Sequence, residues 1–182
     1  CFLYKGEWCG GGTSEGLPDE NELGTREDLL YALGACARLC YGTGLFDTEG
    51  SDWGQLDPPL EGEGWIVIDQ ICETTNSDET VQAGLYVPEG RNLPIAIVAF
   101  RGTCTRKGIF QDLGIGLPMY RRHLKHAIME ACSYLAKCRA RLPNHHIYVT
   151  GHSLGGLIAE ATASYMAADG AVFNSPGPVK AA

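Results

Sequence analysis

The sequence has no uninterrupted apolar run near the roughly 18 residues that a membrane-spanning helix needs, so no transmembrane span is predicted. It also has no basic patch interleaved with aromatic side chains, and a nucleic-acid partner is therefore not expected. What the sequence does have is a hydrophobic content of 45% over 182 residues, which is enough for the core of one compact globular domain.

The eight cysteines include no Cys-x-x-Cys pair, and no spacing of cysteine and histidine resembles a zinc site. Neither a metal nor a cofactor is therefore expected. Cys36 and Cys40 lie four residues apart on a predicted helix, among apolar neighbours. This spacing favours small buried hydrophobic residues over a disulfide, although both interpretations stay open. The cysteine pattern assigns no cellular compartment.

The formal charge of -8 is divided unevenly along the chain. Residues 1–90 hold 18 acidic and 3 basic residues, whereas residues 91–182 hold 4 acidic and 11 basic residues. Because opposite charges attract, the two halves are expected to attract each other. The basic residues of the second half are dispersed along a predicted helix, which is typical of a solvated face.

Neither end of the sequence is predicted to be a natural end of the protein. The chain begins at Cys1 without an initiator Met or a charged and then apolar leader, which predicts that either a targeting segment has been removed or the start is missing. It stops at Ala182 soon after a predicted strand. Residues 1–24 are rich in glycine and acidic residues without sustained periodicity, which predicts an irregular arm. Residues 25–182 are predicted to form part of a domain whose C-terminal portion is missing.

The order of the predicted elements indicates the fold class. Strands 65–72 and 80–87 suit an antiparallel hairpin at one side of a sheet. The remaining strands alternate with helices, which is typical of a parallel sheet covered by helices. We therefore predict an α/β fold with a mostly parallel sheet, an N-terminal antiparallel hairpin and flanking helices. The other predicted elements are a helix capped by Thr25 and stopped by Gly42 and Gly44, strand 95–100, a helix opened by Pro118, strand 146–150, a turn over 151–156, helix 157–168 and strand 171–174.

The pentapeptide Gly151-His-Ser-Leu-Gly155 carries the candidate chemistry. A G-x-S-x-G sequence can arise by chance in a chain with 24 glycines, but this one follows a predicted strand and precedes an amphipathic helix. That setting is typical of a nucleophile elbow. The elbow turn is so sharp that the positions two before and two after the nucleophile cannot carry a Cβ, and Gly151 and Gly155 meet this need. Ser153 is therefore the predicted nucleophile.

An oxyanion hole is predicted from two loops beside Ser153. The N–H of Leu154 lies in the turn that leads into the next helix, whose positive dipole end favours a developing oxyanion. Thr103 follows the neighbouring apolar strand 95–100 and is the candidate second donor, and the alternative for it is an ordinary strand-end turn. His152 belongs to the elbow but is not the predicted base, because adjacent residues on such a turn point apart.

The ordered motifs of the sequence resemble those of the class 3 lipase family over residues 25–180. The motifs are Ala99-Phe-Arg-Gly-Thr103, Asp112-Leu113, Thr150-Gly-His-Ser-Leu-Gly-Gly156 and Phe173-Asn-Ser-Pro-Gly177. The resemblance implies an α/β-hydrolase fold, Ser153 as nucleophile, an oxyanion hole of Thr103 and Leu154, and a lid-like stretch near 104–116. It also implies a carboxylic ester substrate, commonly an acylglycerol, and transient contact with a lipid interface.

The sequence departs from the family at the catalytic acid and base. In the family an Asp and a His follow the Ser-Pro-Gly strand, and here the sequence stops at Ala182. Asp169 and the histidines before Ser153 are not expected to replace them, because no carboxylate is predicted to orient those histidines. The fragment itself is thus expected to be nearly inert. The histidines in question are His123, His126, His145 and His146.

The predicted function is a serine carboxylic ester hydrolase that works through an acyl-enzyme, with a lipase as the leading interpretation. One alternative is a catalytically dead module that binds lipid or protein, which the missing acid and base and the apolar lid-like residues favour. Another is an acyltransferase with the same nucleophile. The acyl chain and the head group are left open, because both depend on the shape of the pocket.

Overall fold

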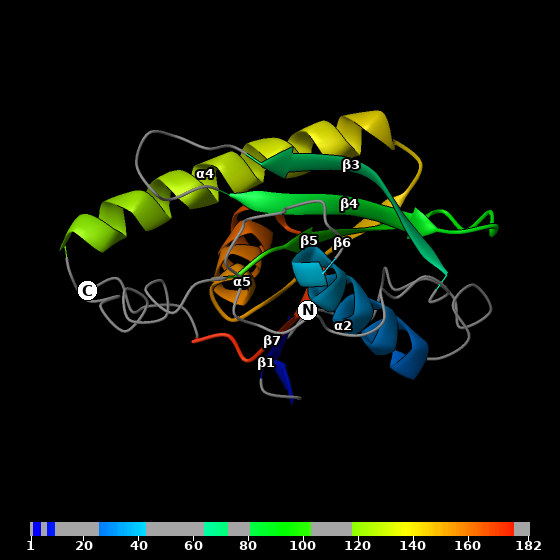
Figure 1. Ribbon diagram of the computed structural model, residues 1–182, viewed down its shortest axis with the longest axis horizontal. Helices are drawn as coiled ribbons and strands as arrows, with labels where there is room; N and C mark the ends of the chain where they lie inside the picture. The colour runs from blue at the N-terminus through cyan, green and yellow to red at the C-terminus, as the bar shows by residue number, and fades with distance from the viewer. Residues whose placement is uncertain are drawn as a thin grey trace.

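The computed structural model describes residues 2–4, 7–9, 26–42, 64–72, 81–102 and 118–176 (Figure 1). In chain order, its elements are β1 (Phe2–Tyr4), β2 (Glu7–Cys9), α2 (Arg26–Gly42), β3 (Trp65–Cys72), β4 (Gln82–Pro88), β5 (Ile95–Phe100), α4 (Pro118–Arg141), β6 (His146–His152), α5 (Leu154–Met166) and β7 (Gly170–Phe173).

The strands form one seven-stranded sheet in the order β2-β1-β7-β6-β5-β4-β3. The neighbours β1, β7, β6 and β5 run parallel to one another. The hairpin of β3 and β4 is antiparallel and extends the sheet beyond β5. This arrangement confirms the predicted α/β class, the mostly parallel centre and the hairpin at one side.

The first residues differ from the prediction. The sequence predicts an irregular arm over 1–24, but Phe2–Tyr4 and Glu7–Cys9 form an antiparallel strand pair. The strand β1 also pairs with β7 next to Gly170 and Ala171. Three-residue strands are too short to show a period, so pairing with β7 and not local pattern decides this edge. The rest of the predicted arm lies outside the described residues.

Helices cover both faces of the sheet, with α2 on one face and α4 and α5 on the other (Figure 1). The strand β5 lies between the layers and is buried along its whole length, as its continuous apolar run predicts. Its even-numbered residues, such as Val98, pack in the cluster with α4 and α5, whereas its odd-numbered residues, such as Ile97, pack with α2. The C-terminal end of β5 is thus held by packing on both faces of the sheet. It leads into Arg101 and Gly102, which are called the exit of β5 below.

The helix α2 carries the two cysteines whose state the sequence left open. Cys36 and Cys40 are both fully buried thiols, which confirms the favoured interpretation as small core residues. The Cys40 Sγ donates a hydrogen bond to the Ala99 carbonyl oxygen at 3.1 Å. Thr150 of β6 adds a second tie, because its Oγ1 donates to the Leu33 carbonyl oxygen at 3.1 Å. These contacts join α2 to the two central strands.

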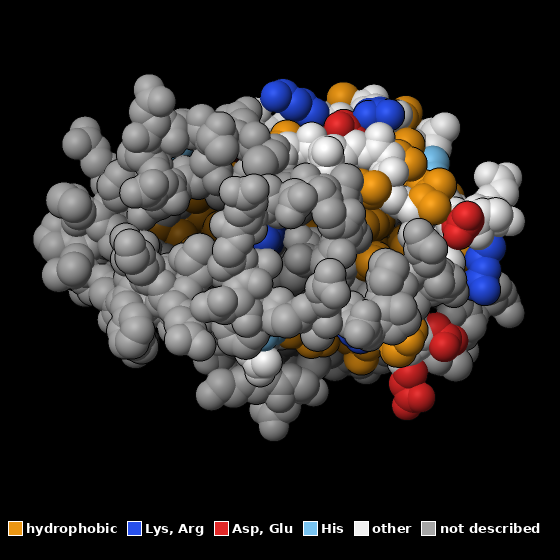
Figure 2. Space-filling model, viewed as in Figure 1, with side chains coloured by type: hydrophobic (Ala, Val, Ile, Leu, Met, Phe, Trp, Pro, Cys, Tyr) orange, Lys and Arg blue, Asp and Glu red, His pale blue; other side chains and the backbone are white. Residues whose placement is uncertain are grey.

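The helix α4 has the predicted division into an apolar and a basic face. Leu135 and Cys138 are buried in the core, whereas Lys125 and Lys137 are exposed. Figure 2 shows basic side chains gathered over α4 along the upper edge of the molecule. At the end of this helix Arg141 lies 2.8 Å from Asp69 of β3. This pair joins a basic residue of the second half of the chain to an acidic residue of the first half.

The boundaries around Ser153 are sharper than predicted. The sequence predicts a turn over 151–156 and a helix from 157, but β6 continues to His152 and α5 starts at Leu154. The predicted boundaries are wrong because the low helix propensity of Gly155 and Gly156 favours a turn in the local pattern. Packing of α5 against the sheet offsets their low helix propensity. The whole reversal from strand to helix therefore falls on one residue.

Candidate active site

Ser153 occupies that reversal in a strained backbone conformation. Its φ is 56° and its ψ is -125°, and a positive φ is uncommon for a residue with a side chain. Such conformations cost about 1–3 kcal/mol and persist only where the surrounding structure imposes them. Here the Ser153 N–H donates to the Phe173 carbonyl oxygen at 3.0 Å, and the Leu157 N–H donates to the Ser153 carbonyl oxygen at 3.2 Å. These bonds anchor the turn at Ser153 to β7 through its N–H and to α5 through its carbonyl oxygen.

The two glycines of the pentapeptide lie where backbone segments approach most closely. A Cβ built on Gly151 would lie under 3.0 Å from backbone atoms of Gly155 and Gly156. A Cβ built on Gly155 would lie under 3.0 Å from backbone atoms of Phe100, Arg101 and Gly102. Real Cβ atoms essentially never make contacts this short. The backbone of the elbow (residues 151–155) is therefore packed directly against the backbone at the exit of β5.

Leu154 is the first residue of α5. The N–H groups of a helix's first turn have no acceptor within the helix, so they are free to bind an anion. Ser153 is the N-cap of this helix, but its side chain makes no capping hydrogen bond. The side chain of Ser153 is also only half-buried. The Ser153 hydroxyl is thus not used to cap α5, and the N-terminal end of this helix lies beside it.

The second predicted oxyanion donor follows the last described residue of its segment. Arg101 and Gly102 continue from β5 and are both buried. The Gly102 backbone touches the elbow at Gly155. Thr103 and the lid-like stretch 104–116 lie outside the described residues. The chain therefore enters the predicted oxyanion loop directly beside the elbow.

His152 contacts Asn174, the residue that follows the end of the neighbouring strand β7. Its Nε2 lies 3.3 Å from the amide nitrogen of Asn174, a residue with a positive φ of 48° just after β7. Burial lowers the pKa of His152, which favours the neutral imidazole. A neutral ring can accept the Asn174 amide N–H at Nε2. This contact joins the elbow to Asn174, which the sequence analysis included only as part of the motif Phe173-Asn-Ser-Pro-Gly177.

A second pair joins the same strand exit to α5. Ser175 Oγ donates to Glu160 Oε2 at 3.4 Å, and Ser175 is buried. Burial raises the pKa of Glu160, and the hydrogen bond from Ser175 offsets part of this rise. The close approach of Gly156 to the Ser175 Cβ brings the segments together. Sequence reasoning missed Glu160, because its partner lies fifteen residues away along the chain.

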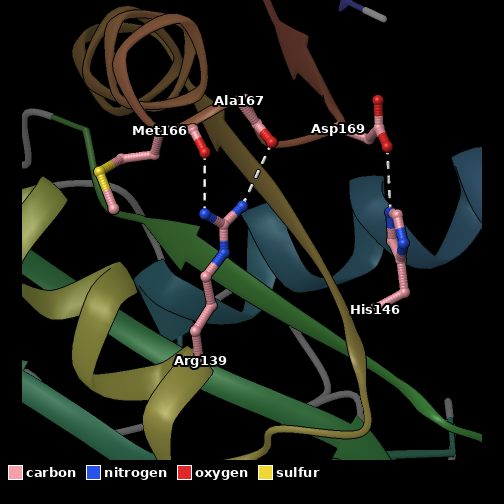
Figure 3. A network of polar contacts seen from close by, with 5 residues as sticks. All are labelled: Arg139, His146, Met166, Ala167 and Asp169. Carbon is pink, nitrogen blue, oxygen red and sulfur yellow. Dashed lines mark hydrogen bonds and ion pairs between the residues drawn. The ribbon is translucent and has the colours of Figure 1, made fainter.

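One argument from the sequence is wrong, because carboxylates do lie beside two of the histidines. His146 Nε2 lies 3.0 Å from Asp169 Oδ2 (Figure 3), and His126 Nδ1 lies 3.3 Å from Glu130 Oε1. The local pattern could not show the first pair, because Asp169 reaches His146 only when β7 pairs with β6.

The pair of His146 and Asp169 nevertheless lies far from Ser153. His146 begins β6, whereas Ser153 follows the last residue of that strand. At about 3.3 Å per residue, the strand separates the two ends by roughly 20 Å. Near this pair, Arg139 donates to the Met166 and Ala167 carbonyl oxygens at 2.8 and 3.3 Å (Figure 3). These bonds satisfy carbonyl groups at the C-terminal end of α5. These contacts therefore lie at the opposite end of β6 from the elbow.

Within the described segments, no group of three or more His, Cys, Asp or Glu side chains could hold a metal ion. No helix in those segments has the length and hydropathy to cross a membrane.

Comparisons with known proteins place this geometry in a family. No curated protein matches the sequence significantly. Among solved structures, the chain is similar to a fungal lipase in complex with an inhibitor, a structure that was presented as a model for interfacial activation. The identity is 18% and the TM-score is 0.51, and the match covers 78% of this chain and 56% of that one. It is also similar to the nonglycosylated LIP2 lipase of Yarrowia lipolytica, with 14% identity, a TM-score of 0.48 and coverage of 79% and 56%.

The similarity to the first of these structures, together with the family match given below, confirms the predicted α/β-hydrolase fold and the predicted resemblance to a lipase family. The chain spans 56% of the length of each of the two solved lipases. The family model that matches the sequence is named Phospholipase-like and describes a Tle-like phospholipase domain, and it matches residues 67–180. Because this match covers more than half of the chain, the protein belongs to the family of Tle-like phospholipase domains.

Proposed function

We propose that this chain is the nucleophile-bearing part of a serine carboxylic ester hydrolase that acts on lipid esters. The observation that supports it best is the strained backbone of Ser153, with a φ of 56°, at the single-residue turn between β6 and α5. Strain of this kind is kept where function needs it. The name of the matching family favours a phospholipid substrate, and the similarity to fungal lipases favours an acylglycerol. Both are esters of long acyl chains.

In this proposal Ser153 Oγ attacks the carbonyl carbon of the ester and loses its proton to a base. The resulting oxyanion accepts hydrogen bonds from the Leu154 N–H and from Thr103. The tetrahedral intermediate collapses, the proton passes to the departing alcohol, and an acyl-enzyme remains. Water then attacks the acyl group by the same route in reverse and releases the fatty acid. The base and its orienting acid are expected from residues outside the described part of the chain.

The test compares Ser153→Ala with Ser164→Ala in the full-length protein. Ser164 lies on α5, the helix that follows Ser153; it is exposed and donates to the Glu160 carbonyl oxygen, so its replacement is a matched control. Fatty-acid release is measured from phosphatidylcholine vesicles and from a triacylglycerol emulsion. Ser153→Ala is expected to lower kcat by about a millionfold, because the nucleophile is lost, whereas Ser164→Ala stays active. Equal activity of Ser153→Ala and the wild type would overturn the proposal.

A fluorophosphonate label separates the proposal from its alternatives. Stoichiometric labelling of Ser153 is expected in the wild type and in Ser164→Ala, but not in Ser153→Ala. Without labelling or hydrolysis, the interpretation as a lipid- or protein-binding module replaces the hydrolase. If the label binds but an added alcohol receives the acyl group in preference to water, the protein is an acyltransferase. The chain of residues 1–182 alone is expected to show little turnover.

A further inference from the structure

The exit of β5 is held to β4 by two hydrogen bonds from Arg101 to one residue, Gln82. The Arg101 backbone N–H donates to the Gln82 carbonyl oxygen at 2.9 Å, and Arg101 Nη1 donates to Gln82 Oε1 at 2.8 Å. The first bond continues the ladder of β4 and β5 one residue beyond the pair of Ala83 and Phe100. The second bond involves a charged donor on a residue that is only 6% exposed, and such bonds are stronger than neutral ones.

The segment that Gln82 holds is the one that touches the elbow. A Cβ built on Gly155 would lie 2.7 Å from the Arg101 carbonyl carbon and 2.7 Å from the Gly102 nitrogen. At this separation the backbone of Arg101 and Gly102 cannot shift toward the elbow, and its hydrogen bonds to β4 hold it from the other side. The next residue along the chain is Thr103, the predicted oxyanion donor.

The side-chain bond limits the conformations open to Arg101. A guanidinium carries its donors in a fixed planar fork, so an acceptor that engages Nη1 also restricts the long side chain behind it. Oxyanion donors are effective only about 2.7–3.1 Å from the developing charge. A displacement of about 1 Å can lower the rate by about a hundredfold. A residue that restrains the start of the loop can therefore influence the chemical step.

We propose that Gln82 is a positioning residue for the oxyanion loop and that it acts through Arg101 on Thr103. The inference rests on the proposed hydrolase function and adds a residue of β4 to it. Gln82 itself touches no reacting atom. The loss of its side-chain acceptor weakens stabilisation of the oxyanion, which exists in the transition state and not in the bound ester. Such a loss lowers kcat and leaves KM unchanged.

The experiment uses the full-length protein and the variants Gln82→Met, Gln82→Glu and Gln70→Met. Gln82→Met keeps the length of the side chain and the backbone bond but removes the acceptor Oε1. Gln82→Glu restores an acceptor oxygen. Gln70→Met is the matched control, because Gln70 is exposed on the neighbouring strand β3. We measure kcat and KM on a soluble short-chain nitrophenyl ester, and divide kcat by the fraction of sites that a fluorophosphonate titrates.

We expect Gln82→Met to lower kcat per titrated site about tenfold, which corresponds to about 1.4 kcal/mol, with KM unchanged. Gln82→Glu is expected to recover most of that loss, and Gln70→Met is expected to match the wild type. A merely structural role lowers the titrated fraction or the melting temperature but not kcat per titrated site. If Gln82→Met does not fold, Gln82→Ser, whose hydroxyl is too short to reach Arg101, is judged by the same criteria.

The outcomes separate this inference from the proposed function. If the wild type hydrolyses esters and Gln82→Met has the same kcat per titrated site, the inference is overturned and the hydrolase stands. A rise in KM at constant kcat, or a Gln82→Glu variant as slow as Gln82→Met, overturns it as well. If the wild type neither labels nor hydrolyses, the proposed function falls, and the inference falls with it.

Discussion

Replacing Gly155 by Ala tests the contact between the elbow and the exit of β5. The added Cβ would meet the Phe100 carbonyl oxygen, the Arg101 carbonyl carbon and the Gly102 nitrogen, all at under 3.0 Å. All three are backbone atoms, so no flexible side chain can move aside. Overpacking of this kind lowers the free energy of unfolding by about 1–3 kcal/mol. We expect the upper part of that range, because three contacts must be relieved at once.

The matched control is Gly34→Ala in α2. Its Cβ would lie 3.4 Å from the Phe173 ring, which is an ordinary contact. Alanine favours a helix by about 1 kcal/mol over glycine, so this variant is expected to be as stable as the wild type or slightly more stable. The same chemical change is thus expected to have opposite effects at the two positions.

The free energy of unfolding of both variants is measured by urea unfolding, followed by circular dichroism. With a slope of about 1–3 kcal/mol per molar urea, a loss of about 3 kcal/mol lowers the midpoint by about 1 M or more. Ester hydrolysis by full-length Gly155→Ala is expected to fall by about a hundredfold, because the predicted oxyanion loop shifts relative to Ser153. An unchanged midpoint for Gly155→Ala, or an equal loss in Gly34→Ala, would refute the reasoning from close backbone approach.

Two further predictions concern the same part of the molecule. Ser153→Gly is expected to be more stable than Ser153→Ala by about 1 kcal/mol in urea unfolding, because glycine adopts the positive φ at Ser153 without strain, and equal midpoints would contradict this. Burial raises the pKa of Glu160 above its ordinary value of 4.5, so the folded state holds this proton more tightly and stability falls as the pH rises through the raised pKa. Glu160→Gln is therefore expected to melt at a higher temperature than the wild type at neutral pH, and this difference is expected to disappear below pH 4.5. A difference in melting temperature that does not depend on pH would argue against the burial of a charged carboxylate.

The elbow could be predicted before any coordinates were considered, because local chemistry decides it. Two glycines flank Ser153 at the spacing that a sharp turn needs, and the apolar strand before them and the apolar helix after them are short-range patterns. The run of Ile95–Phe100 predicted a buried strand for the same reason, since an unbroken apolar segment can only lie between two layers.

The contacts around the elbow depend on parts of the chain that are distant in sequence. Gln82 and Arg101 lie 19 residues apart, and His146 and Asp169 lie 23 residues apart. No local periodicity connects such pairs, because their partners are chosen by strand register. The expectation that His146 has no carboxylate partner failed for this reason.

The sequence by itself determined the class of the fold, the nucleophile candidate and the need for glycine on both sides of it. Only the tertiary structure decided that the elbow presses on the exit of β5, that Gln82 holds that exit, and that β1 continues the sheet beyond β7. Propensity and periodicity act over a few residues, whereas register and packing join segments whose separation along the chain leaves no pattern to read.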